Sequence, residues 1–381
     1  MAIDRRALIG SGLALAALPA ELARAAYRRD PVMNSIALED GRVWIAATIK
    51  AKPYLFVVDT GAFVSFIDDG FAKSIGLQPV PGMQIRGVGG VSDKSWYNAG
   101  DVALASGIHF PDMLFAGIRG RPSPDAVGTL GAGLFTTYDS DLDFEKGQWR
   151  AYPDGRPNFD GLVKLKSRFT KGVGGASIVA EASIDGFTGD FLLDTGAPNN
   201  LSINGRAAKR SGLWDDSKPY APAMSRGIGA GAIPARIVRS RRIMIGPFAF
   251  DGHLVKLDQP GSIGSEQDGL IGLHLLGQLQ LSTDVSGGVL YAKENGRLAA
   301  QEAYPLSGLW LEERKDRVVI GDVGTGSPAA RAGLQKGEML VGGDLSAMIR
   351  TINGNAGKTV VLNVDRGGVQ REVRYTLAPW L

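Results

Sequence analysis

Two short motifs in this 381-residue sequence have the residue types needed for acid–base chemistry, because each places an aspartate directly after a run of apolar residues. Asp59 follows Val-Val, Asp194 follows Leu-Leu, and both are followed by Thr-Gly-Ala. A single aspartate at a strand end is usually a turn former or a helix cap. Two copies in matching surroundings favour a functional role for both.

The expected chemistry follows from the behaviour of two neighbouring carboxylates. Like charges that lie close together cannot both ionise, so such a pair retains one proton over a wide pH range. One carboxylate can then act as general base on a bound water, while the protonated one donates a hydrogen bond to the group under attack. Gly61 and Gly196 would allow close backbone approach at the pair. The hydroxyls of Thr60 and Thr195 could hydrogen-bond across to the other half of the site.

An internal repeat supplies the elements that must position these residues. Residues 42–59 and 177–194 both read as a strand, a polar turn and a second strand that ends at the aspartate. Further matches follow in the same order: residue 70 with 205, 86–89 with 226–229, 128–131 with 269–272, and 143 with 284. Short strands and glycine-rich turns predict a mainly β fold with one brief helix per lobe. A pseudo-twofold axis between the lobes would bring the two aspartates face to face.

These motifs resemble those of aspartic peptidases of the pepsin and retropepsin type. The similarity covers residues 35–295 and includes the paired Asp-Thr-Gly-Ala loops and the later apolar-glycine segments at 129–131 and 270–272. Each lobe is closer in length to a retropepsin monomer than to a pepsin lobe. The resemblance therefore implies a bilobal, retropepsin-like acid protease fold in one chain. It also implies peptide-bond hydrolysis by a water activated between Asp59 and Asp194, with no metal or other cofactor.

Glycine-rich segments after each motif are the candidate flap tips that this resemblance implies: Gly87, Gly89, Gly90, Gly227, Gly229 and Gly231. An ordinary hairpin turn is the alternative for either segment alone, and their equivalent placement in the repeat favours flaps. Pepsin-like enzymes also carry a flap tyrosine. No residue here matches it, since Trp96 and Tyr97 lie slightly later in the sequence.

Alanine at two positions of the motifs bears on the working pH. Ala62 and Ala197 stand where pepsin-type enzymes carry a hydroxyl residue. A hydroxyl can donate to the carboxylate and favour its charged form, which alanine cannot do. We therefore expect dyad pKa values above those of strongly acidic pepsins, and activity at weakly acidic to neutral pH.

Residues 303–381 do not repeat the lobe. The segment 327–334 reads Ser-Pro-Ala-Ala-Arg-Ala-Gly-Leu and is followed by Lys-Gly-Glu at 336–338. This pattern predicts a turn, a short helix that ends at glycine and a strand. We also expect a second helix at 345–352 and strands at 359–364 and 370–377.

The order of these elements resembles a bacterial PDZ domain, with Glu338 in place of the usual aspartate. The resemblance implies a small α+β domain that binds the C-terminal segment of a peptide as an added strand. The carboxylate of that peptide would meet the loop at Gly308, Leu309 and Trp310. A domain that takes no ligand and only braces the protease is the alternative.

The first 25 residues are typical of an export signal. Two arginines at 5–6 precede a mildly apolar run at 7–20, and Ala-Arg-Ala at 23–25 offers small residues to a signal peptidase. A helix over this run would rise about 21 Å, too short to span a bilayer. The paired arginines resemble a twin-arginine signal, with ordinary secretory export as the alternative. We expect a periplasmic or otherwise exported bacterial protein, with no integral membrane span after signal removal.

Composition excludes several other classes of protein. Without cysteine, the chain has no disulfide, thiolate metal site or cysteine nucleophile. Its three histidines are not at metal-ligand spacing, so no metal site is expected. A net charge of +3 gives no basic patch for nucleic acid. The basic run at 236–242 reads as a solvated strand face, with a substrate contact as the alternative.

The sequence thus predicts four parts: an export signal at 1–25, lobes at 30–158 and 159–299, and a PDZ domain at 303–381. The predicted activity is an aspartic endopeptidase that cleaves an extended polypeptide, with the PDZ domain for substrate or partner recognition or for regulation. A non-catalytic envelope adaptor that binds peptides in the cleft and PDZ groove is the alternative. Two intact motifs argue against it. Removal of a pro-segment at 26–35 is left open.

Overall fold

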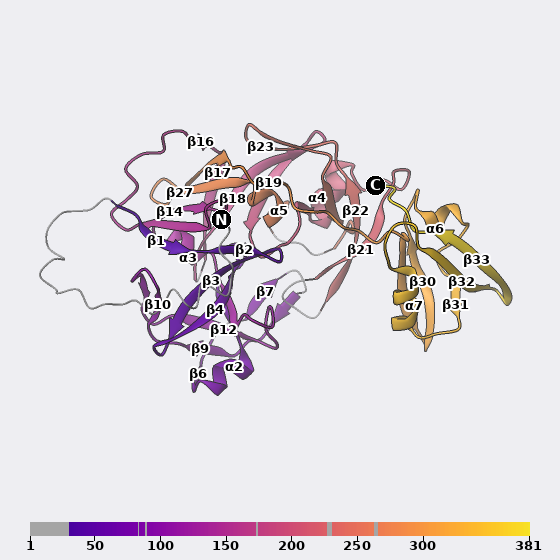
Figure 1. Cartoon of the computed structure of the whole chain (residues 1–381), viewed down its shortest axis with the longest axis horizontal. Helices are drawn as coiled ribbons and strands as arrows, with labels where there is room; N and C mark the ends of the chain where they lie inside the picture. Colours follow the sequence, from indigo (N-terminus) through magenta and orange to yellow (C-terminus); the bar gives the residue numbers. More distant parts are fainter. Residues whose placement is uncertain (1–29, 83, 88–89, 173, 227–230, 263–265) are drawn as a thin grey trace, which may run out of the picture.

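A computed structural model of the chain describes residues 30–381 apart from 83, 88–89, 173, 227–230 and 263–265. The predicted export signal lies outside the described residues. Two β lobes lie side by side, and a smaller domain sits at one end of the molecule (Figure 1). No helix in the described part of the chain is both long and apolar enough to cross a membrane.

The N-terminal lobe is built on one ten-stranded sheet, in which β2 pairs with β3 and the other strands follow the order β11-β10-β3-β4-β13-β5-β12-β9-β6. Its strands are β2 (Ala37–Glu39), β3 (Arg42–Ile49), β4 (Lys52–Val58), β5 (Ser65–Asp68), β6 (Pro79–Val80), β9 (Trp96–Asn98), β10 (Val102–Leu104), β11 (His109–Phe110), β12 (Leu114–Ile118) and β13 (Gly128–Leu130). A separate hairpin is formed by β7 (Ile85–Gly87) and β8 (Gly90–Ser92).

The C-terminal lobe has a sheet of the same size, in which β17 pairs with β18 and the other strands follow the order β21-β22-β25-β20-β26-β19-β18-β23-β24. Its strands are β17 (Ser167–Gly172), β18 (Gly175–Ile184), β19 (Phe187–Asp194), β20 (Leu201–Ile203), β21 (Ala221–Arg226), β22 (Ala232–Arg239), β23 (Arg242–Ile245), β24 (Phe248–Asp251), β25 (Leu254–Asp258) and β26 (Gly269–Gly272).

The first hairpin of each lobe shows why the repeated sequence folds the same way twice. Two residues connect β3 to β4, and two connect β18 to β19. Positive φ at both turn residues matches the right-handed twist of the paired strands. Asp185 and Gly186 adopt it with φ of 48° and 96°, and Lys50 and Ala51 adopt it with 50° and 60°. The turn geometry is therefore kept even where the favourable Asp-Gly pair is absent.

In the residues that the structure describes, each lobe contains two short helices, where the sequence predicted one. The predicted helices are α2 (Asp69–Ser74) and α4 (Gly205–Ser211), which are capped by Asp68 and Asn204. The additional ones are α3 (Gly133–Thr136) and α5 (Leu273–Leu276). Each of these lasts four residues and has no side-chain cap, so it carries none of the usual start signals.

A six-stranded sheet joins the two lobes, in the order β1-β15-β14-β27-β28-β16. Its strands are β1 (Val32–Ser35), β14 (Asp139–Asp143), β15 (Gln148–Tyr152), β16 (Val163–Lys164), β27 (Leu279–Asp284) and β28 (Val289–Glu294). At its centre β14 of one lobe pairs antiparallel with β27 of the other, with Leu142 opposite Leu281. One continuous hydrophobic core runs through both lobes, so they form a single unit.

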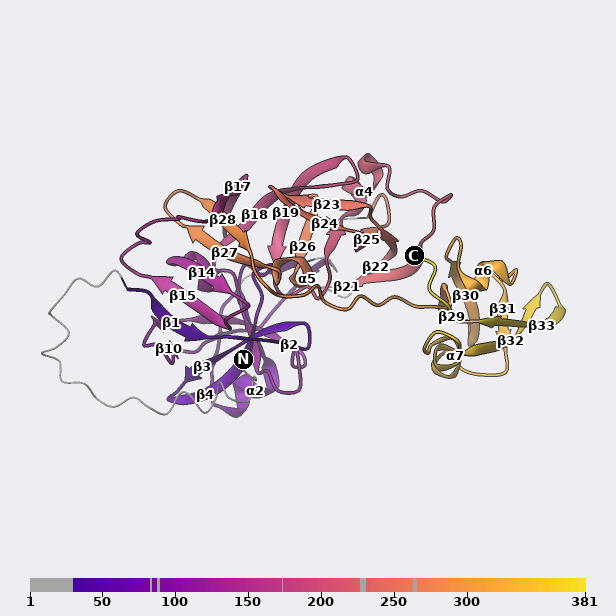
Figure 2. The same cartoon turned by 45° about the horizontal axis from the view of Figure 1, so that its top comes forward.

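The C-terminal domain is a five-stranded sheet with two helices and a hydrophobic core of its own. Its elements are β29 (Leu309–Arg314), β30 (Arg317–Val323), α6 (Pro328–Arg331), β31 (Met339–Val341), α7 (Leu345–Ile352), β32 (Thr359–Arg366) and β33 (Val369–Thr376). α7 has the bounds predicted from the sequence. The domain extends away from the lobes in both views, with β21 as the nearest labelled lobe strand (Figure 2).

Candidate active site

Asp59 and Asp194 each lie at the end of the second strand of a repeated hairpin, β4 and β19. A crossing strand supports each one from behind. β13 runs parallel to β4, and the carbonyl of Leu130 accepts the Asp59 N–H at 2.9 Å. β26 runs parallel to β19, with Gly272 beside Asp194. The segments at 129–131 and 270–272 therefore occupy equivalent places.

The threonines that follow the aspartates lock the two lobes together. Thr60 Oγ1 donates to the carbonyl of Leu193 at 2.8 Å, and Thr195 Oγ1 donates to the carbonyl of Val58 at 2.8 Å. Each hydroxyl also accepts the backbone N–H of the other threonine at 3.1 Å. Both threonines are buried. These four hydrogen bonds across the lobe interface fix the two loops relative to each other.

The two carboxyl groups lie close enough for the charge of Asp59 and a hydrogen bond between the two to affect their pKa values. The backbone N–H groups of Gly61 and Gly196 each donate to the aspartate of their own loop, at 3.1 and 2.9 Å. A Cβ atom at either glycine would lie 2.5 Å from the carboxyl carbon of the opposite aspartate. No side chain can fit there without moving that carboxyl group. Glycine is thus required at both positions by a close approach.

The surroundings shift the titration of both carboxyl groups. Burial raises the pKa of Asp59, and hydrogen bonds from Asp194 and the backbone partly offset this. Burial, and then the negative charge of Asp59, raise the pKa of Asp194 well above its ordinary value. Both side chains remain partly exposed to solvent. The pair therefore holds a proton well into the pH range in which isolated aspartates are charged, and the proton favours Asp194.

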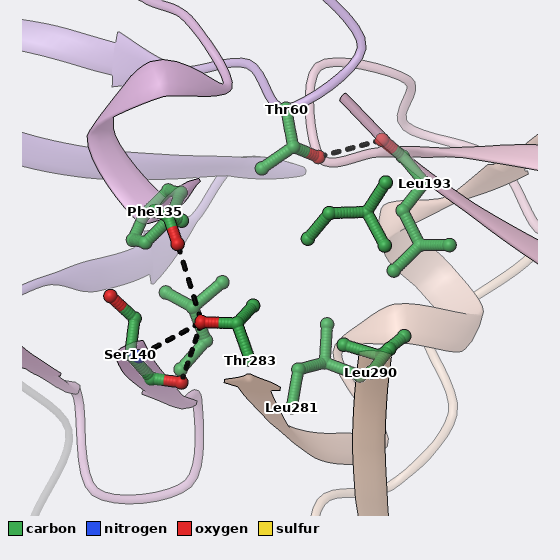
Figure 3. Close-up of a pocket in the computed structure, with 9 residues that line it drawn as sticks. Thr60, Phe135, Ser140, Leu193, Leu281, Thr283 and Leu290 are labelled. Carbon is green, nitrogen blue, oxygen red and sulfur yellow. Dashed lines mark hydrogen bonds between the residues drawn. The ribbon is translucent and has the colours of Figure 1, made fainter. Parts of the chain in front are cut away.

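A small apolar cavity lies between the Asp-Thr-Gly-Ala loops and the shared sheet (Figure 3). Leu193, Leu281 and Leu290 line it, together with Thr60 and other side chains of the sheet. Its polar groups are already paired, since Thr60 donates to Leu193 and Thr283 Oγ1 accepts the Ser140 N–H at 2.8 Å. The cavity offers no polar contact to a ligand, so we interpret it as part of the apolar packing that supports the dyad.

The candidate flap tips fall on two hairpins that occupy equivalent places in the lobes. Gly87 pairs with Gly90 at the end of β7 and β8, and Gly231 directly precedes β22. Gly89, Gly227 and Gly229 lie outside the described residues. Neither residue weighed as a flap tyrosine is on a hairpin tip, because Trp96 and Tyr97 are buried in β9. The Tyr97 hydroxyl donates to Asp69 Oδ1 at 2.9 Å.

The predicted carboxylate loop of the C-terminal domain is occupied by internal contacts. The N–H of Gly308 donates to the carbonyl of Pro305 at 3.3 Å, and the N–H of Leu309 donates to Ser307 Oγ at 3.2 Å. Trp310 lies in β29 opposite Asp322. Two of the amides expected to hold a peptide carboxylate are therefore already used. β29 is nevertheless an edge strand of its sheet, where a further strand can add.

The structure corrects the predicted solvation of the basic run at one residue, Arg236, whereas Arg239, Arg241 and Arg242 are exposed as predicted. Arg236 is buried, forms an ion pair with Asp216 at 2.6 Å, and lies over the ring of Tyr220 at 3.8 Å. Arg242 forms an ion pair with Asp251 at 2.6 Å. In the described part of the chain, no group of three histidines or acids could hold a metal ion.

Two polar residues that sequence reasoning missed support the strands after the Asp-Thr-Gly-Ala loops. Ser65 Oγ accepts the N–H of Gly131 at 3.0 Å. Asn200 donates to Glu302 Oε1 at 2.6 Å and to the carbonyl of Leu254 at 3.0 Å. Each follows its aspartate by six residues. This equal spacing is the one signal that could have found them.

Comparison with known families agrees with this arrangement. The family described as aspartyl protease matches residues 45–133 and 180–275, one segment in each lobe. Each lobe therefore contains a region similar to that family. The predicted fold, mainly β with two lobes of the acid protease type, is confirmed, and the match supports a protease function.

Solved structures that are similar to this chain include the following three proteins. Basic 7S globulin from soybean is 11% identical, with 69% of this chain and 95% of that chain covered and a TM-score of 0.39. An aspartic proteinase from Irpex lacteus is 11% identical, with 70% and 98% covered and a TM-score of 0.43. A retropepsin-like aspartic protease from Rickettsia conorii is 19% identical, with 35% and 89% covered and a TM-score of 0.25. No curated protein sequence gives a significant match.

Proposed function

We propose that this protein is an aspartic endopeptidase in which Asp59 and Asp194 activate a water molecule for peptide-bond hydrolysis. The observation that best supports it is the interlock of the two loops, in which each glycine lies so close to the opposite aspartate that a Cβ atom there would be 2.5 Å from its carboxyl carbon. Structural roles for two strand-end aspartates would not require their carboxyl groups to meet. Their contact keeps one proton between them, as general acid–base catalysis requires.

We place the starting proton on Asp194, whose pKa is raised by burial and by the charge of Asp59. Asp59 is the ionised base and takes a proton from the water, whose oxygen bonds to the scissile carbonyl carbon. Asp194 gives its proton to the carbonyl oxygen, and the former carbonyl carbon becomes a tetrahedral centre with two hydroxyl groups, a diol. The carbon–nitrogen bond then breaks as the proton on Asp59 moves to the leaving nitrogen, and a diol proton returns to Asp194. The dyad ends as it began, and no cofactor takes part.

The substrate in this proposal is a polypeptide bound in extended form between the lobes, beneath the β7–β8 and β21–β22 hairpins. The C-terminal domain would act as a PDZ-like module that recognises a substrate or partner, or regulates cleavage. Its edge strand β29 supports strand addition, whereas the internal hydrogen bonds at 308–309 do not favour carboxylate capture. The export motif at 1–25 supports a periplasmic or otherwise exported location in a bacterium.

The test is cleavage of an internally quenched peptide library by the wild type, Asp59→Asn and Asp194→Asn. Each substitution removes one proton carrier from the dyad, so we expect kcat/KM to fall at least about 10³-fold in both. Asp154→Asn is the matched control, because Asp154 is exposed in a turn away from the dyad, and its activity should equal that of the wild type. Equal cleavage by all four proteins would refute the dyad. Peptide binding without cleavage by the wild type would favour the adaptor.

A further inference from the structure

The wall of the C-terminal lobe beside the dyad differs in chemistry from the matching wall of the N-terminal lobe. In each lobe one strand runs parallel to the strand that follows the catalytic loop: β12 beside β5 and β25 beside β20. Phe66 lies opposite Ala116 in the first pair, and Ser202 lies opposite Lys256 in the second. Lys256 thus occupies the place in its lobe that Ala116 occupies in the other.

The N-terminal wall is apolar. Ala116, Phe66 and Trp96 pack in one buried cluster with Ala62 and Val64. Ala62 belongs to the Asp-Thr-Gly-Ala loop itself, so this cluster lies directly beside Asp59. Because the lobes repeat each other, the equivalent wall of the C-terminal lobe lies beside Asp194.

Strand alternation directs Lys256 to that wall. Its neighbours Val255 and Leu257 are buried in the hydrophobic core, and successive side chains of a strand point to opposite faces. Asp258 lies on the same face as Lys256 and accepts a hydrogen bond from Ser225. The C-terminal wall therefore carries charged and hydroxyl groups where its counterpart carries only apolar ones.

The ammonium group of Lys256 lacks a fixed partner. Among the residues that the structure describes, it forms no hydrogen bond or ion pair. Burial lowers the pKa of Lys256, and the negative charges of Asp258 and then of Asp194 oppose this shift, so both carboxylates lie near enough to affect it. An ammonium group has three donors, and withdrawing it from water without acceptors is unfavourable. The side chain remains partly exposed, so a ligand can reach it.

We propose that Lys256 binds a carboxylate side chain of the substrate, so that the enzyme prefers glutamate or aspartate at one position flanking the scissile bond on the side of the C-terminal lobe. This inference rests on the proposed protease function. A carboxylate both neutralises the ammonium and accepts its hydrogen bonds, and charge-assisted bonds are stronger than neutral ones. Asp258 lies near enough for its charge to favour the ammonium form of Lys256, but among the described residues the two form no ion pair, and the Asp258 carboxylate accepts a hydrogen bond from Ser225. On the opposite wall the apolar cluster favours an apolar side chain.

The test uses internally quenched peptides built on a sequence that the wild type cleaves, with glutamate or glutamine placed at each flanking position in turn. At one position the wild type should cleave the glutamate peptide about tenfold faster, in kcat/KM, than the glutamine peptide. Lys256→Met keeps an unbranched apolar stem and removes the charge, so its ratio should fall to about one. Lys256→Arg should retain most of the preference. Lys293→Met removes an exposed lysine of β28 and should leave the ratio at the wild-type value.

The outcomes separate this inference from the proposed function. Cleavage by the wild type with equal rates for glutamate and glutamine at every position would overturn the role of Lys256 and leave the protease intact. So would an unchanged preference in a folded Lys256→Met. If the wild type cleaves no peptide, the protease proposal fails. Binding of the same peptide pair to Asp59→Asn, measured by fluorescence anisotropy, then decides whether Lys256 still selects a carboxylate.

Discussion

Around the dyad the N-terminal and C-terminal lobes repeat each other contact for contact, but on the adjoining walls their side chains differ. The loop hydrogen bonds of Thr60 and Thr195 have equivalent partners in the opposite lobe and the same lengths. One strand away, Ala116 in one lobe corresponds to Lys256 in the other. The loops are alike and the walls differ because the two regions have different contacts. Each loop packs against its own repeat, so a change on one side disturbs both. In the proposed function each wall would contact only its own part of a substrate.

The largest expected effect tests the symmetric part of this comparison. Gly61→Ala and Gly196→Ala would each place a Cβ 2.5 Å from the carboxyl carbon of the opposite aspartate. Because small misplacements of reacting groups are costly, we expect kcat/KM to fall about 10²-fold or more in both variants, to a similar extent. Gly70→Ala is the control, since a Cβ there meets only the side chain of Asp68 at 3.3 Å. A large loss in one variant alone would break the symmetry.

A second prediction concerns the charge on the dyad, where the two lobes are less alike. Carboxyl groups with a raised pKa in the folded protein bind more protons than in the unfolded chain at weakly acidic and neutral pH. The folded state therefore loses stability as the pH rises through the raised pKa values, and the contribution is fully regained below the ordinary aspartate value. Asp194→Asn removes the more strongly raised group, so its melting temperature should exceed that of the wild type at pH 7.

Two controls and one kinetic measurement test the raised pKa values of the dyad further. The gain of Asp194→Asn should shrink as the pH is lowered toward 4, and Asp59→Asn should show a smaller gain at pH 7. An equal or lower melting temperature for both variants at pH 7 would contradict the raised pKa values. For the wild type, kcat/KM should peak at weakly acidic to neutral pH. A sharp maximum below about pH 3 would show that the dyad is as acidic as that of strongly acidic pepsins.

The dyad and the β architecture could be predicted from the sequence because local patterns that occur twice indicate both. The hairpins, the Asp-Thr-Gly-Ala loops and the crossing strands are each set by short runs of residues with a fixed spacing. The shared six-stranded sheet was not foreseen, because it forms by pairing Leu142 with Leu281, far apart in the chain. The uncapped helices α3 and α5 lack local signals.

The role of single polar residues was harder to predict for a different reason. Lys256 and Arg236 lie in strands of ordinary composition, and only the folded structure tells which face each side chain occupies. Arg236 was interpreted as solvated, yet its guanidinium lies between aromatic rings and an aspartate. Alternation within the run Leu-Val-Lys-Leu-Asp at 254–258 contains the clue for Lys256. The alternation alone does not show that Lys256 faces the dyad. That conclusion depends on its equivalence with Ala116, which is seen only when the sheets of both lobes are compared.

The smallest expected effect tests an asymmetry at the far end of the molecule, where β29 and β30 of the C-terminal domain contact β21 of the C-terminal lobe. The Tyr220 hydroxyl, next to β21, lies 3.1 Å from both Asp322 Oδ1 and the carbonyl of Val323 in β30. Its one proton serves these two acceptors, and Tyr220→Phe removes the bond while keeping the ring that stacks on Arg236.

A partly buried hydrogen bond of this kind stabilises docking by about 1 kcal/mol. We therefore expect hydrogen exchange in β21 and β30 to quicken about fivefold in Tyr220→Phe, with little change in exchange at the dyad loops. Tyr54→Phe is the matched control in the other lobe, where the ring packs on Phe71 with its centroid 4.8 Å away, and it should leave exchange at the junction unaltered. If exchange in the β7–β8 hairpin rose as well, the domain would be coupled to both lobes. The C-terminal domain would then affect the N-terminal lobe as well as the C-terminal lobe that it contacts.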